Sequence, residues 1–105
     1  MMDVGLAAVA NQLLSVQLSQ RQYQIAIHEA NGIMAATIIR DGAVIISGAR
    51  IVAGTPLLPY RYEEEESGNF LITVDGEALP YWDQFGVTQF LVYLTAAELA
   101  AYRAA

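Results

Sequence analysis

The stretch that decides the fold is Phe85–Leu99, which reads FGVTQFLVYLTAAEL. Every residue of its segment Phe90–Leu94 is aliphatic or aromatic, so the alternation that is typical of a half-exposed strand is missing. A strand with two apolar faces is covered on both sides and belongs at the centre of a sheet. The side chains expected on one face are Phe90, Val92 and Leu94, and those expected on the other are Leu91 and Tyr93.

A short helix is expected directly after this strand. Thr95 is followed three residues later by Glu98, and in such a capping box each side chain satisfies a free backbone N–H of the first helical turn. The strand therefore ends at Leu94, and the helix begins at this capping box.

The first half of the chain predicts a series of short antiparallel strands. A turn is expected over residues 19–22, and the dipeptides Asn31-Gly32 and Asp41-Gly42 are typical of type I′ hairpin turns. Two such turns ten residues apart predict a three-stranded antiparallel meander, preceded by a further strand. The expected strands are Leu14–Leu18, Tyr23–His28, Ile33–Arg40 and Ala43–Ser47.

In the second half of the chain, the expected strands are interrupted by longer loops and proline-containing connections. Ala49–Ala53 fits a short strand or an irregular turn equally well, and Thr55–Tyr60 contains two prolines, so we expect it to cross an end of the sheet. A loop with four glutamates then leads into a strand at Phe70–Val74. The sequence predicts an all-β fold, a small antiparallel β-barrel or sandwich of about seven short strands with a short C-terminal helix, in a single domain over residues 1–105.

The composition limits which classes of binding partner the chain can have. The formal net charge is −6, and the five cations are isolated arginines without any lysine, which argues against binding to nucleic acid. The apolar fraction of 55% is above the usual range and indicates protein partners. No run of residues is long and apolar enough for a membrane span, so we expect none.

The sequence offers little for catalysis. It has no cysteine, and its one histidine, His28, lies on the polar side of an expected strand. Asp83 and Glu98 could be drawn as a pair of catalytic carboxylates, but such pairs can be picked from almost any chain. We expect no enzyme activity, no cofactor and no metal site.

Aromatic and acidic residues in the loops are the candidates for assembly contacts. The tyrosines and the tryptophan lie on the two proline-containing connections, which are expected at one end of the fold, and aromatic side chains are enriched at protein interfaces. The four consecutive glutamates repel one another, so we expect them in solvent in the free chain and against a basic surface in an assembly. With two residues of the central strand, the suspected assembly contacts are Tyr60, Tyr62, Glu63, Glu64, Glu65, Glu66, Tyr81, Trp82, Leu91 and Tyr93.

A set of short motifs appears in a characteristic order between Val9 and Leu99. They are Asn11-Gln12, Asp41-Gly42, Pro56–Tyr60, Gly68–Phe70, Phe85-Gly86, Leu91–Leu94 and Ala97–Leu99. With this set the chain resembles the baseplate plug family of contractile-tailed bacteriophages, which includes the plug of a cyanophage baseplate. It departs from the family pattern at Ala10, where a proline is expected, and at Phe90, where a polar or basic residue is more usual.

The resemblance implies a structural virion protein without catalytic residues. Such a protein plugs the axial channel of the tail at the baseplate, next to the central hub or spike and the tail tube, and is displaced when the tail contracts. It is made in the host cytoplasm and works as a cyclic homo-oligomer of three or six copies. The alternatives are a free-standing β-barrel module that binds a small ligand or carbohydrate, and a small enzyme that uses carboxylates.

Overall fold

The computed structural model describes residues 2–58, 64, 68–76 and 79–104. Within these residues the chain forms seven strands, one short 3-10 helix at Trp82–Gln84 and one α-helix. The strands are β1 (Met2–Asp3), β2 (Gln12–Leu18), β3 (Arg21–Ala30), β4 (Ile33–Arg40), β5 (Ala43–Arg50), β6 (Asn69–Val74) and β7 (Gln89–Leu94), and the helix is α1 (Ala96–Ala104).

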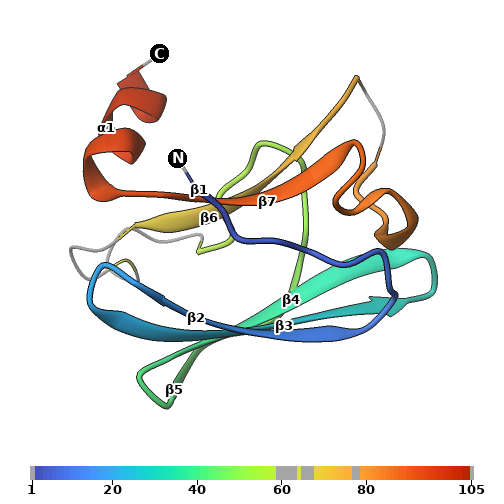
Figure 1. The fold of residues 1–105 in the computed structure, drawn as a ribbon, viewed down its shortest axis with the longest axis horizontal. Coiled ribbons are helices and arrows are strands. Elements are labelled where there is room, and N and C mark those ends of the chain that lie inside the picture. Colours follow the sequence, from blue (N-terminus) through green and yellow to red (C-terminus); the bar gives the residue numbers. More distant parts are fainter. Residues whose placement is uncertain (1, 59–63, 65–67, 77–78, 105) are drawn as a thin grey trace.

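Two antiparallel sheets stack on each other (Figure 1). The larger sheet has the order β2-β3-β4-β5, and the smaller one has the order β1-β7-β6. Neither sheet closes on itself and no strand among the described residues joins the two, so the fold is a β-sandwich and not a barrel.

Two-residue turns connect the strands of the larger sheet. Asn31-Gly32 and Asp41-Gly42 have positive φ angles at both positions, as the sequence predicted for type I′ turns. Ser19 and Gln20 also have positive φ angles, of 51° and 64°, so a third tight hairpin joins β2 to β3. The meander therefore contains four strands, one more than the two glycine turns alone predicted.

The core lies between the sheets and follows the alternation of the strands. The larger sheet turns one set of alternating side chains inward, and the smaller sheet does the same from the other side. The core side chains from the two sheets that are at most 3% exposed are Tyr23, Ile25, Ile27, Met34, Ala36 and Ile38 from the larger one, and Phe70, Ile72, Leu91 and Tyr93 from the smaller one.

The central strand is covered on both faces, as its sequence predicted. It lies in the middle of the smaller sheet, with Leu91 and Tyr93 in the core and Val92 and Leu94 on the outer face. The outer pair packs with Leu71 of β6 and Leu99 of α1. The capping box forms as expected, because the backbone N–H of Thr95 donates to Glu98 Oε1 at 3.0 Å, and that of Glu98 donates to Thr95 Oγ1 at 3.3 Å.

The structure shows the path of the two segments that follow the larger sheet. Strand β5 continues to Arg50, so only the last part of Ala49–Ala53 is irregular. The sequence predicted that Thr55–Tyr60 crosses an end of the sheet, and this prediction is wrong for the part that the structure describes. The segment runs along the outer edge of β6 instead. There the N–H of Leu57 donates to the carbonyl oxygen of Phe70 at 2.8 Å.

Candidate assembly surface

Half of the suspected assembly contacts lie outside the described residues. The structure therefore places only some members of the aromatic and acidic set. The residues that lie outside are Tyr60, Tyr62, Glu63, Glu65 and Glu66.

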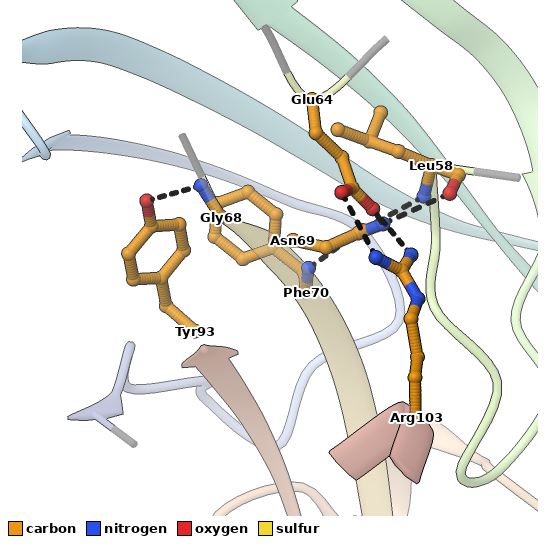
Figure 2. A network of polar contacts seen from close by, with 7 residues as sticks. All are labelled: Leu58, Glu64, Gly68, Asn69, Phe70, Tyr93 and Arg103. Carbon is orange, nitrogen blue, oxygen red and sulfur yellow. Dashed lines mark hydrogen bonds and ion pairs between the residues drawn. The ribbon is translucent and has the colours of Figure 1, made fainter. Parts of the chain in front are cut away.

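Glu64 is the one described glutamate of the acidic run and it is buried, and Figure 2 shows its contacts with Arg103 and Asn69. Its carboxylate accepts two hydrogen bonds from the guanidinium of Arg103 in α1, at 3.1 Å and 2.6 Å. This bidentate pair raises the pKa of Arg103 above its ordinary value, chiefly through the hydrogen bonds to Glu64. The prediction that all four glutamates lie in solvent is therefore wrong for Glu64, which joins the helix to the loop before β6.

Asn69 completes this buried network. Its Nδ2 donates to Glu64 Oε2 at 2.6 Å and to the carbonyl oxygen of Leu58 at 2.9 Å, and its Oδ1 accepts from the N–H groups of Leu58 and Phe70. Every polar atom of this fully buried amide thus has a partner, which is what burial of a polar group requires. The network holds the loop before β6 and α1 to the fold, and within it Glu64 and Asn69 are buried while the Arg103 side chain is 27% exposed.

Leu91 and Tyr93 also belong to the interior. Both side chains are at most 3% exposed, so a neighbouring subunit has no surface of theirs to contact. The Tyr93 hydroxyl shares a hydrogen bond with Ser19 Oγ at 2.6 Å and accepts one from the N–H of Gly68 at 2.8 Å. It therefore ties the smaller sheet to the β2–β3 turn, and we assign both residues to the fold.

Tyr81 and Trp82 lie at one end of the sandwich, beside the turn between β3 and β4. Their rings are neighbours, with centroids 5.8 Å apart, and both are half-buried. The Tyr81 hydroxyl donates to Glu29 Oε2 at 3.3 Å, and the same oxygen accepts the N–H of Gly32 at 3.0 Å. Glu29 therefore holds the aromatic connection against the hairpin turn.

The same end carries an apolar pocket of about 270 Å³. Four segments meet there: the β3–β4 turn with the start of β4, the end of β5, the end of β6, and the connection that precedes Tyr81. Large exposed apolar side chains form its rim, with exposed fractions of 43% for Ile33, 47% for Val52 and 75% for Leu79. We call the surface formed by Ile33, Arg50, Val52, Leu79, Tyr81 and Trp82 the end surface.

Arg50 is the charged member of the end surface. It is the only charged side chain that lines the pocket among the described residues, and none of their carboxylates pairs with it. An exposed arginine beside apolar side chains suits a partner that presents a carboxylate next to an apolar group. Sequence reasoning singled out only Tyr81 and Trp82 here, because the other members are far apart in the chain.

A comparison with protein families matches residues 1–96 to the family described as the cyanophage baseplate Pam3 plug gp18. The match covers all seven strands and stops at the first residue of α1. The chain belongs to this family. A comparison with curated proteins finds no match.

Membership in the plug family gives a structural role in a phage baseplate, a location in the virion baseplate and association with other baseplate proteins. The described part of the chain contains no helix that is long and apolar enough to cross a membrane. In that same part, no three groups of the kinds that bind metal ions lie close enough together to share one.

Proposed function

We propose that the chain closes the axial channel of a contractile phage tail at the baseplate. It sits next to the central hub or spike and the tail tube and is displaced when the tail contracts. The observation that carries this proposal is the family match over all seven strands. In this role residues 1–105 act as one structural domain that is made in the host cytoplasm and has no enzyme activity or cofactor.

Closure of a channel on an axis requires symmetric copies of so small a chain. Contacts between unlike patches of neighbouring copies close into a ring, so we propose a cyclic homo-oligomer of three or six subunits. The described candidates for contacts to neighbours are Tyr81 and Trp82, together with the rest of the end surface. Tyr60, Tyr62, Glu63, Glu65 and Glu66 remain proposed contacts from their sequence.

The pocket of the end surface, whose lining does not include the neighbouring Tyr81 and Trp82, suits a protein partner more than a carbohydrate. It is lined by aliphatic side chains and Arg50, without an aromatic ring among the described residues. A sugar-binding site needs aromatic faces for stacking, whereas a pocket of this kind suits an apolar anchor residue of another protein.

Electron cryomicroscopy of baseplates that contain this chain tests the proposal. We expect density for three or six copies around the tail axis, in contact with hub and tube proteins. A single copy away from the axis, or a position on the outside of the baseplate, would contradict it.

A variant pair tests the end surface separately. Leu79→Asp places a charge on the rim of the pocket, and we expect it to lower incorporation into baseplates about tenfold or more, since loss of one anchor residue costs roughly 2 kcal/mol. Val44→Asp is the matched control, because Val44 is 61% exposed at the start of β5 and does not line the pocket. Equal incorporation of both variants would remove the end surface from the proposal and leave the baseplate role intact.

A further inference from the structure

Two open sheets leave four edges, and three of them are blocked in the part of the chain that the structure describes. Strand β1 is two residues long. The edge of β6 is covered by the chain after β5, where the N–H groups of Gly54 and Leu57 donate to the carbonyl oxygens of Ile72 and Phe70. Strand β5 is broken by two register shifts against β4, and its Gly48 has a φ of +63°. Short, covered or bulged edges resist pairing with another chain.

Among the described residues, the fourth edge, that of β2, has none of these protections. Its seven residues read QLLSVQL, without a charge, a proline or a glycine. The strand pairs with β3 at every position from Gln12 to Leu18, without a bulge. A long, regular and uncharged edge of this kind is a template for the addition of a strand.

The register shows which backbone groups of β2 are open. Leu18 and Arg21 flank the two-residue turn, so they form a hydrogen-bonded pair, and such pairs alternate along an antiparallel ladder. The backbone groups of Leu13, Ser15 and Gln17 therefore point away from β3. These three residues offer the N–H and C=O groups of the open edge.

The inner face of this edge is incompletely covered. Leu14 and Val16 pack against the main core but are only partly buried, unlike the inward side chains of β3 and β4. A strand added beside β2 would cover both of them. The edge thus offers hydrogen-bonding groups and apolar surface together.

We propose that two copies of the chain pair through β2, antiparallel to each other, about a two-fold axis at Ser15. In this register Ser15 faces the partner's Ser15, Leu14 faces the partner's Val16 on the inner side, and Leu13 faces the partner's Gln17 on the outer side. The register suits two copies, because Leu14 meets Val16 on the inner side, no charged side chain of the strand is paired, and about six backbone hydrogen bonds form. The two four-stranded sheets become one sheet of eight strands.

Charge favours a second copy at this edge over a contact elsewhere on the chain. Each copy carries a net charge of −6, so two copies repel one another unless their contact avoids acidic groups. Pairing through β2 places no charged side chain of that strand at the axis. A two-fold contact closes on itself and cannot propagate around a ring, so this pairing is separate from the ring contacts proposed above, and its failure leaves them untouched.

Two double variants test the pairing and its register. Leu13 is 65% exposed and Gln17 is exposed, so changes at both leave the core intact. In L13K/Q17K each lysine faces a lysine of the partner, whereas in L13K/Q17E each lysine faces a glutamate. By sedimentation equilibrium at neutral pH, we expect a dimer for the parent and for L13K/Q17E, and at least a tenfold weaker dimer for L13K/Q17K. Circular dichroism melting checks that all three are folded.

Single cysteines give a second measurement, because the chain has no cysteine of its own. Ser15→Cys places two thiols on a pair of residues with Cα atoms about 5.5 Å apart, so mild oxidation should form a disulfide-linked dimer. Gln24→Cys is the matched control, since Gln24 lies opposite Ser15 on β3 and its copies would be about 14 Å apart. A parent protein that stays monomeric at high concentration, a trimer or hexamer without a Ser15→Cys disulfide, or equal association of the two double variants would overturn the proposal.

Discussion

At the scale of single residues, Tyr93 connects three parts of the fold through one side chain. Its ring packs against Phe70 and Tyr23, with centroids 5.2 Å and 6.2 Å away, while its hydroxyl contacts Ser19 and Gly68. Tyr93→Phe keeps the ring and removes the hydroxyl, which leaves the buried N–H of Gly68 without that acceptor. We expect a loss of about 1–3 kcal/mol in the free energy of unfolding, measured by urea denaturation.

Tyr102→Phe is the control for this prediction. The Tyr102 hydroxyl donates to the carbonyl oxygen of Gly54 at an exposed site, where water replaces the lost partner. The expected loss is within about 0.5 kcal/mol. Equal losses for the two variants would mean that the Tyr93 hydroxyl is not a buried link.

Asp41 gives a prediction for pH at the same scale. Its pKa is lowered, first by the hydrogen bond from Arg21 and then by the one from the N–H of Gln22. An acid with a lowered pKa in the folded state stabilises the fold above its unfolded pKa, and this contribution is lost as pH falls through the folded value. Asp41→Asn keeps a residue that tolerates the φ of 51° but removes the charge.

The melting temperatures of the parent and of Asp41→Asn should therefore differ at neutral pH and converge in acid. The parent is the more stable above about pH 4 and loses this advantage below it. The difference is small, because both side chains of the pair are partly accessible to solvent, with exposed fractions of 29% for Arg21 and 47% for Asp41. A difference that stays constant down to about pH 2 would contradict this account.

At the scale of elements, β7 is the strand on which both apolar clusters depend. Val92 is 6% exposed and lies on the outer face among Leu71, Leu94 and Leu99. Val92→Asp buries an unpaired carboxylate at a cost of several kcal/mol, comparable to the whole stability of a domain of this size. We expect no cooperative melting by calorimetry and recovery of the variant in the insoluble fraction. Val87→Asp, at a position that is 66% exposed just before the strand, should melt like the parent.

At the scale of the whole molecule, the sequence predicted those features that local patterns determine. The all-apolar run at Phe90–Leu94 and the capping box at Thr95 depend on residues a few positions apart, and both are confirmed. The Ser19-Gln20 turn was not recognised as a two-residue hairpin, because neither residue is a glycine. The choice between barrel and sandwich depends on the pairing of distant strands, which local alternation does not encode.

The candidate surface was predicted less well, for the same reason. Four identical neighbours carry no signal that distinguishes Glu64 from the other glutamates, and its partner Arg103 is 39 residues away. The pocket at the end surface is built from four segments, of which only the aromatic connection has a recognisable composition. Arg50 and Leu79 come to line the same pocket only when the two sheets stack.

The acidic run therefore divides into one residue that supports the fold and three that we propose to act in assembly. Glu64→Gln removes the charge that pairs with Arg103 and places an amide against donors that the carboxylate satisfied. A lost hydrogen bond to a charged group costs about 1.5–3 kcal/mol, so we expect the melting temperature to fall by roughly 6 °C or more.

In E63Q/E65Q/E66Q, with Glu64 kept, repulsion between like charges is reduced, and the melting temperature should stay the same or rise slightly. This triple variant should enter baseplates less well than the parent, and the gap should narrow at high salt because salt screens charges beyond about 8–10 Å. A triple variant that unfolds, or one that enters particles as well as the parent at every salt concentration, would remove these three glutamates from the assembly contacts.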